Sequence, residues 1–216
     1  MTNAALIVAA GKGDRAGSAI PKQFVQLGDK ALVAHSFDTF LNHPDIAAIC
    51  VVVGAGQQDM ARQALGSRPV SHLVIGGAER QDSVRAGLTA LAGQGITRVL
   101  IHDAARPFLP ALVIDRLLAA LDQADGAVPA LAVVDTLARG DGMLGDTVDR
   151  SGLWRIQTPQ AFRFDAIMTS HERWNGGIAT DDAQIARAAG FDVVIVDGDP
   201  ALEKVTHSGD FVTARK

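Results

Sequence analysis

The clearest indication of fold class in this chain is Ala4-Ala-Leu-Ile-Val-Ala-Ala10, followed at once by Gly11-Lys-Gly-Asp-Arg15. A short, continuous apolar run of this kind is typical of a strand that is buried on both faces of a parallel sheet. Glycines after such a strand let backbone N–H groups approach a phosphate, and open α/β sheets bind ligands at the carboxyl ends of their strands. The stretch therefore predicts a buried strand that leads into a ligand-binding loop.

Similar apolar runs recur along the chain, and helical patterns lie between them. The further runs are residues 46–53, 73–75, 99–102, 127–134 and 193–196. Apolar residues recur at helical spacing in 81–91 and 112–121. This alternation predicts a doubly wound α/β fold, and because neither an internal repeat nor a linker interrupts it, we expect one domain over residues 1–216.

One segment breaks the alternation. Residues 135–139 and 147–154 resemble short strands, and they flank the glycine-containing stretch 140–145. Two short strands around a glycine-rich turn predict a hairpin. It could be an edge hairpin of the sheet or an arm that reaches a partner subunit, and the pattern supports both.

Composition excludes several classes of protein. The chain has 216 residues, of which 48% are hydrophobic and 20% charged, which is typical of a globular protein and not of a disordered one. Its 20 basic and 24 acidic residues give a net charge of −4, which argues against a nucleic-acid-coating protein. No apolar stretch approaches the roughly 18 residues needed to span a bilayer, and the N-terminus lacks the basic region of a signal peptide. With Cys50 as the single cysteine, we expect a cytoplasmic protein that binds neither membrane nor nucleic acid.

The first loop combines glycines with cations. Gly11-x-Gly13-x-x-Ala16 satisfies a permissive dinucleotide-binding pattern, but Pro21 opposes the immediate long helix that such a site requires, and the Walker pattern is absent. Arg15 and Lys22 could neutralise a polyphosphate and the charge of a phosphoryl-transfer transition state. A plain tight turn with two solvated cations is the alternative.

The loops after the third and fourth predicted strands are also polar. Backbone groups of Gly77 and the Ser83 hydroxyl could bind a base edge, although Asp82 or Ser83 could instead cap the following helix. Asp103 ends a buried run and could hold a metal ion or a ribose hydroxyl. Arg106 could bind an anionic substrate or form an ion pair with Asp103 that closes the loop.

Basic residues gather beside the predicted strand ends and the hairpin, although the protein is acidic overall. They are Arg15, Lys22, Arg80, Arg106, Arg150 and Lys204. This clustering indicates a pocket for an anionic ligand. The chain contains no His-Glu-x-x-His, no paired-cysteine motif and no Gly-x-Ser-x-Gly. It therefore lacks the sequence motifs of zinc enzymes and of hydrolases with a nucleophile elbow.

Taken together, these motifs resemble the 2-C-methyl-D-erythritol 4-phosphate cytidylyltransferase family over nearly the whole chain. In order, they are Ala9-Ala-Gly-Lys-Gly-Asp-Arg15, Pro21-Lys-Gln23, Gly76-Gly-Ala-Glu-Arg-Gln-Asp-Ser-Val84, His102-Asp-Ala-Ala-Arg-Pro107, Asp135-Thr136, Val148-Asp-Arg-Ser-Gly-Leu-Trp154, Thr158-Pro-Gln160, Thr180-Asp181 and Lys204-Val-Thr206. Each motif is short, and their joint occurrence in this order is specific.

The resemblance implies a fold, an activity and partners. The fold would be a Rossmann-like nucleotidyltransferase fold with a projecting β-hairpin dimerisation arm at about residues 135–158. The enzyme would be a homodimer that transfers a cytidylyl group from CTP to 2-C-methyl-D-erythritol 4-phosphate, using Mg²⁺ or another divalent cation. The product, 4-diphosphocytidyl-2-C-methyl-D-erythritol, belongs to non-mevalonate isoprenoid synthesis.

The resemblance also implies a role for each site residue. The implied catalytic cations are Arg15, Lys22 and Lys204. The implied nucleotide-binding residues are Ala10, Gly11, Gly13, Gly77, Arg80, Ser83, Asp103 and Ala104, with Asp103 also near the metal. The implied substrate-binding residues are Arg106, Thr136, Arg150, Thr158 and Thr180, of which Thr136 and Arg150 would act in the partner subunit.

Three other functions stay open on the sequence. A cytidylyltransferase for another polyol phosphate, such as ribitol 5-phosphate, shares most of these motifs. A sugar-1-phosphate nucleotidyltransferase shares the first loop but does not predict the arm. A non-catalytic nucleotide-binding regulator would be expected to lack the cations Arg15 and Lys22.

Overall fold

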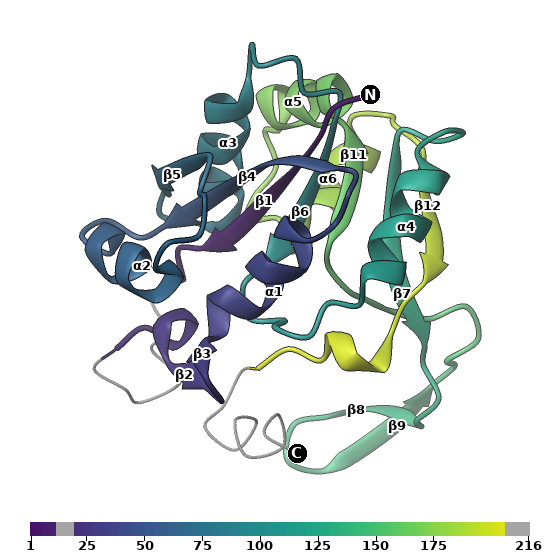
Figure 1. The fold of residues 1–216 in the computed structure, drawn as a ribbon. Helices are drawn as coiled ribbons and strands as arrows, with labels where there is room; N and C mark the ends of the chain where they lie inside the picture. Colours follow the sequence, from purple (N-terminus) through teal and green to yellow (C-terminus); the bar gives the residue numbers. More distant parts are fainter. Residues whose placement is uncertain (12–19, 206–216) are drawn as a thin grey trace.

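A computed structural model describes residues 1–11 and 20–205. Within these residues, helices cover both faces of an 8-stranded mixed sheet (Figure 1). The strands of this sheet are β1 (Asn3–Ala9), β4 (Ile46–Val53), β5 (His72–Ile75), β6 (Arg98–Asp103), β7 (Gly126–Ala132), β10 (Trp154–Ile156), β11 (Gln160–Arg163) and β12 (Val193–Asp197). The predicted α/β class is confirmed.

The strand directions explain where a ligand can bind. β1 is parallel to both β4 and β6, β4 is parallel to β5, and β12 is parallel to β7. β11 is antiparallel to both β6 and β7, so these two strands point the same way. β10 then continues the antiparallel pairing along β7. The six strands predicted from apolar runs are therefore confirmed, and β10 and β11 are additions that the sequence analysis did not contain.

Helices pack on the two faces of the sheet in two sets. One set contains α1 (Leu32–Leu41), α2 (Gln58–Leu65) and α4 (Ala111–Ala120). The other set contains α3 (Arg80–Leu91), α5 (Phe164–Arg173) and α6 (Asp182–Ala188). The predicted helices at 81–91 and 112–121 correspond to α3 and α4. Further short elements are η2 (Lys22–Phe24), β2 (Gln26–Leu27), β3 (Lys30–Ala31) and η3 (Pro200–Leu202). None of the helices in the described part has the length and hydropathy needed to cross a membrane.

The core forms on both faces of β1 because its side chains alternate. Ile7 joins the core on the α1 side with Phe37, and Leu6 joins the opposite core with Leu88 of α3. Gly87 of α3 allows a close approach there, because an added Cβ would lie 2.7 Å from a Leu6 methyl carbon. This two-sided packing explains the continuous apolar run of the first strand.

A separate hairpin, formed by β8 (Leu137–Gly140) and β9 (Leu144–Val148), extends beyond the sheet (Figure 1). All residues from 134 to 147 are exposed. The predicted hairpin is confirmed, but its second strand was placed too far along the chain. Trp154 does not belong to it, since Trp154 pairs with Ala132 in the main sheet.

Candidate active site

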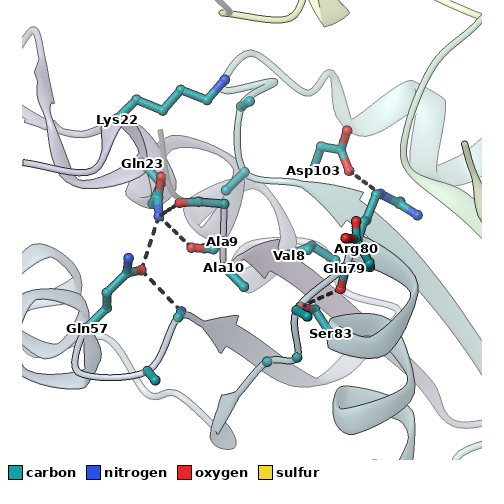
Figure 2. Close-up of a pocket in the computed structure, with 18 of the residues that line it drawn as sticks. Val8, Ala9, Ala10, Lys22, Gln23, Gln57, Glu79, Arg80, Ser83 and Asp103 are labelled. Carbon is teal, nitrogen blue, oxygen red and sulfur yellow. Dashed lines mark hydrogen bonds and ion pairs between the residues drawn. The ribbon is translucent and has the colours of Figure 1, made fainter. Parts of the chain in front are cut away.

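A cavity of about 860 Å³ opens at the carboxyl ends of β1, β4, β5 and β6 (Figure 2). Figure 2 shows Lys22 and Gln23 on one side of it and Arg80 and Asp103 on the other. Its lining comes from the loops that follow the four strands and from two further segments, and comprises residues 8–11, 22–23, 54–55, 57, 76–80, 83, 103–105 and 204. This is the edge at which open α/β sheets bind ligands.

Most of the predicted nucleotide-binding residues line this cavity, together with two of the predicted catalytic cations. The predicted residues found in its wall are Ala10, Gly11, Lys22, Gly77, Arg80, Ser83, Asp103, Ala104 and Lys204. Gly13 and Arg15 lie outside the described residues. The cavity wall does not include Arg106, Thr136, Arg150, Thr158 or Thr180.

Asp103 is the electrostatic centre of the cavity wall. Its carboxylate accepts from Arg80 Nε at 3.0 Å and from Lys204 Nζ at 2.7 Å. Burial alone would raise the pKa of Asp103, but the two cations outweigh it and hold the pKa well below its usual range. The predicted alternative of an ion pair with Arg106 is wrong, because the Arg106 guanidinium instead donates to the Leu202 carbonyl at 2.5 Å.

Arg80, at the start of α3, bonds to carboxylates of β6 and α6. While its Nε binds Asp103 at the end of β6, its Nη1 donates to Asp182 at the start of α6 at 2.7 Å. Asp182 is fully buried, and His171 Nε2 lies 3.3 Å from its other oxygen. Burial alone would lower the pKa of Arg80, but the two carboxylates raise it above its ordinary value, so the guanidinium stays charged. Arg80 therefore fixes the relative positions of α3, α6 and the carboxylate of Asp103.

The loop before α3 packs closely against the first turn of that helix. Glu79 caps the helix, and its backbone N–H donates to Asp82 Oδ2 at 3.2 Å, so the predicted capping role is confirmed for Asp82. The Ser83 hydroxyl donates to the Glu79 carbonyl at 3.2 Å and lines the cavity. An added Cβ at Gly76 would lie 2.4 Å from Ser83 Oγ, and one at Gly77 would lie 2.3 Å from Asp82 Cβ. The two glycines therefore allow the loop to close over the start of the helix.

Two glutamines that the sequence analysis missed organise the opposite wall (Figure 2). Gln23 Nε2 donates to the carbonyls of Ala9 and Gly11 at 2.7 and 2.9 Å. The Gln57 side-chain oxygen accepts from Gly54 N at 3.1 Å and lies 3.3 Å from Gln23 Nε2. Gln23 follows Lys22 in a predicted loop, which was a signal for it, but nothing in the sequence singled out Gln57.

Lys22 reaches across the cavity edge to the last described segment. Its Nζ donates to the Val205 carbonyl at 2.9 Å, next to Lys204. Lys22, Lys204 and Arg80 therefore present positive charge around one opening, although they come from widely separated parts of the sequence. Such an arrangement can bind a polyphosphate and stabilise additional negative charge on it.

The comparisons with known proteins agree with this geometry. The family model described as 2-C-methyl-D-erythritol 4-phosphate cytidylyltransferase matches residues 3–216. The chain belongs to this cytidylyltransferase family. The family resemblance of the motifs is confirmed.

Individual relatives give the same result. The chain is 57% identical over 214 residues to a bifunctional enzyme IspD/IspF of Rhizorhabdus wittichii, covering 99% of this chain and 55% of the relative. It is 47% identical over 218 residues to a 2-C-methyl-D-erythritol 4-phosphate cytidylyltransferase of Cereibacter sphaeroides, covering 100% and 96%. The chain thus spans about half the length of the bifunctional relatives that it matches.

A solved structure supports the fold. The crystal structure of 2-C-methyl-D-erythritol 4-phosphate cytidylyltransferase from Thermus thermophilus superposes with a TM-score of 0.81. Its sequence identity is 33%, with 100% of this chain and 98% of that chain covered. The predicted Rossmann-like nucleotidyltransferase fold is therefore confirmed for this cytidylyltransferase family member.

In this member of the cytidylyltransferase family, the predicted substrate-binding residues lie in three different settings. Thr158 is buried, and its hydroxyl oxygen accepts from Asp103 N at 3.0 Å. Thr180 is exposed before α6 and donates from its hydroxyl to Gln184 Oε1 at 3.2 Å. Thr136 and Arg150 are exposed at the two ends of the hairpin, where Arg150 donates to the Val134 carbonyl. Their contacts with a substrate stay predictions.

Proposed function

We propose that this protein transfers a cytidylyl group from CTP to 2-C-methyl-D-erythritol 4-phosphate and releases pyrophosphate. The observation that carries the proposal is the strand-end cavity, where Lys22, Arg80 and Lys204 gather around Asp103 beside the Gly77–Ser83 loop. Membership of the family and the printed name of the Cereibacter relative support the choice of substrates.

The reaction needs little covalent help from the protein. An oxygen of the substrate phosphate attacks the α-phosphorus of CTP, the new P–O bond forms, and the bond to the bridging oxygen of pyrophosphate breaks. Because a phosphate monoester is already anionic at neutral pH, no general base is required. Catalysis then consists of positioning the reactants and neutralising charge, the tasks we assign to Lys22 and Arg15.

A divalent cation fits the donor groups of the cavity. Mg²⁺ in phosphoryl-transfer sites is bound by one or two carboxylates together with substrate phosphates. In the described part of the wall, Glu79 uses its side chain to cap α3, which leaves Asp103 as the carboxylate for a metal. Lys204 is 41% exposed and can release one Asp103 oxygen. We propose that Asp103 holds Mg²⁺ with the CTP phosphates, where the ion would neutralise phosphate charge.

We assign each part of CTP to residues at the cavity. Gly77 and Ser83 would bind cytosine, supported by Arg80, and Asp103 and Ala104 would bind the ribose. Ala10, Gly11 and Gly13 would bind the triphosphate. On the other side of the reacting phosphorus, Arg106, Thr180 and Lys204 would bind the polyol phosphate, and Thr158 would act from behind the wall through the hydrogen bond that it accepts from Asp103 N.

The hairpin supports a homodimer in which each arm completes the partner's site. A two-stranded hairpin is marginally stable in water by itself. This one exposes 80% of Met143 and 90% of Leu144, which a second copy could cover. We propose that Thr136 and Arg150 act at the polyol phosphate bound by the partner. The buried free thiol of Cys50 agrees with a cytoplasmic location.

Pyrophosphate release with CTP and Mg²⁺ tests the proposal. We expect turnover with 2-C-methyl-D-erythritol 4-phosphate and little with ribitol 5-phosphate. Turnover with ribitol 5-phosphate alone would replace the substrate but keep the reaction type. CTP binding without pyrophosphate release from either phosphate would favour a regulator instead.

A further inference from the structure

We propose that His102 is a positioning residue of this active site, which fixes Asp103 through the hydroxyl of Thr158 and fixes Arg106 through its backbone carbonyl. The proposal rests on the proposed function for what Asp103 and Arg106 bind. It assigns to His102 a task that does not involve contact with either substrate.

The hydrogen-bond partners determine which nitrogen of His102 carries the proton. The imidazole is completely buried, and its Nε2 lies 2.9 Å from the Arg106 carbonyl oxygen. A carbonyl can only accept, so Nε2 must be the protonated nitrogen. The other ring nitrogen, Nδ1, faces the Thr158 hydroxyl, whose oxygen already accepts from Asp103 N. The hydroxyl proton is therefore directed to Nδ1, which is unprotonated and accepts the hydrogen bond.

The donor to Nδ1 is the Thr158 hydroxyl, at 3.2 Å. The oxygen of that hydroxyl also accepts from the Asp103 backbone N–H, at 3.0 Å. A directed chain results, in which Asp103 N–H donates to Thr158, Thr158 donates to His102, and His102 donates to the Arg106 carbonyl. Each polar atom in this chain has the partner that its chemistry requires.

This chain spans the turn that separates two candidate substrate-binding groups. β6 ends at Asp103, and the chain reverses so that Arg106 N donates to the Asp103 carbonyl at 3.0 Å. From this turn the Asp103 side chain joins the cavity wall, while the Arg106 side chain extends to Leu202. The Phe40 ring packs nearly perpendicular to the imidazole at a ring-centroid distance of 5.6 Å, which leaves the imidazole little freedom to move. His102 therefore holds both ends of the turn at once.

Two substitutions separate the two hydrogen bonds of His102. The amide of His102→Gln can reach the Arg106 carbonyl but no longer accepts from Thr158, whereas the shorter amide of His102→Asn can accept from Thr158 but cannot reach Arg106. We expect each to lower kcat/KM by about 10- to 100-fold, the effect of displacing a reacting group by about 1 Å. We expect His102→Gln to weaken CTP more, and His102→Asn to weaken the polyol phosphate more.

A double-mutant cycle tests whether Thr158 acts in the same chain. Thr158→Val removes the hydroxyl with little change in volume, and it should lower CTP affinity as His102→Gln does. The double variant should be no worse than either single variant, since both break the same link. Thr158→Ser should recover most of what Thr158→Val loses. His43→Gln is the matched control, because His43 is also buried but pairs with Asp115 outside the cavity wall.

Two measurements keep this test separate from the proposed function. Calorimetric CTP binding does not depend on which phosphate is the second substrate, and ¹⁵N NMR of the wild-type imidazole reports its tautomer without any ligand. Additive losses in the double variant, or lower melting temperatures with unchanged CTP affinity and kcat/KM, would overturn the proposal. A proton on Nδ1 of His102 at neutral pH would overturn it even in a protein that does not turn over. Wild-type CTP binding without turnover would count against the proposed function alone.

Discussion

The strand-end cavity and the β8–β9 hairpin both contain residues that we assign to substrate binding, but the chain supports them in different ways. Asp103 is held by two cations and ends a strand that is buried on both faces. Thr136 and Arg150 flank a hairpin that is exposed from Leu137 to Thr147. One chain therefore fixes the residues that we propose bind the nucleotide, whereas we propose that the arm packs against a partner subunit. Substitutions in the two regions should accordingly have different consequences.

The largest effect is expected in the cavity. Lys22→Ala should lower kcat by about 10²- to 10³-fold, because a fixed charge near the transition state is lost. CTP affinity should fall by much less, because other cations still surround the triphosphate. Steady-state kinetics and calorimetric CTP binding measure the two effects. Lys30→Ala is the control, since Lys30 pairs with Asp38 outside the cavity wall. Equal losses of binding and turnover would exclude a role for Lys22 that is specific to the transition state.

The second effect tests the dependence of the arm on a partner. Leu144→Asp places a charge on the most exposed apolar side chain of the hairpin, so it should dissociate the dimer and lower turnover by about 10-fold or more. Sedimentation at several protein concentrations measures the assembly. Ile195→Asp on the edge strand β12 is the matched control, since Ile195 is a half-exposed apolar residue outside the arm. A Leu144→Asp protein that stays dimeric would show that the arm is not the interface.

A smaller and more selective effect is expected at the end of the arm. Arg150→Ala should raise the KM for the polyol phosphate by about 10-fold, because it removes one charge-assisted hydrogen bond to the phosphate. CTP affinity should stay unchanged. Arg139→Ala removes a neighbouring exposed cation from β8 and serves as the control. If both variants behave alike, the arm contributes only general positive charge.

The smallest effect concerns the scaffold beside the cavity. Asp38 of α1 accepts from Arg68 and from Lys30, and these contacts, Arg68 first, lower its pKa to about 2 despite partial burial. Asp38→Asn should cost about 2 kcal/mol of unfolding free energy at pH 7, measured by urea unfolding.

The pH dependence of this contribution follows from the sign of the shift. Because the folded pKa lies below the unfolded one, the stabilisation is present above about pH 4 and is lost as the pH falls towards 2. Asp59→Asn should have little effect, because Asp59 is 98% exposed in its pair with Arg62. If the unfolding free energies of wild type and Asp38→Asn depend on pH in the same way, the contacts of Asp38 with Arg68 and Lys30 contribute nothing to stability.

The sequence predicted the parallel strands because each of them is a continuous apolar run. It did not predict β11, because Gln160-Ala-Phe-Arg163 is short and half polar, and the sheet itself supplies its neighbours. The candidate cations were found from their position after strands. The pairing of Arg80 with Asp103 was not predicted, because the two residues follow different strands and meet only in the folded chain. Gln57 bonds the backbone N–H of Gly54, for which a single sequence offers no pattern, and His102 lies within a recognised motif but meets Thr158 only in the folded chain.

Mixing Lys22→Ala and Arg150→Ala chains tests most directly whether one chain's cavity works with another chain's arm, provided that activity is assayed well below the KM for the polyol phosphate, where both variants are impaired. In a heterodimer of Lys22→Ala and Arg150→Ala chains, one site combines an intact cavity with an intact arm, and the other site carries both substitutions. Random mixing should therefore restore roughly a quarter of the wild-type activity, since half of the dimers are mixed and each has one intact site. No recovery in heterodimers verified by native mass spectrometry would contradict a site shared between subunits.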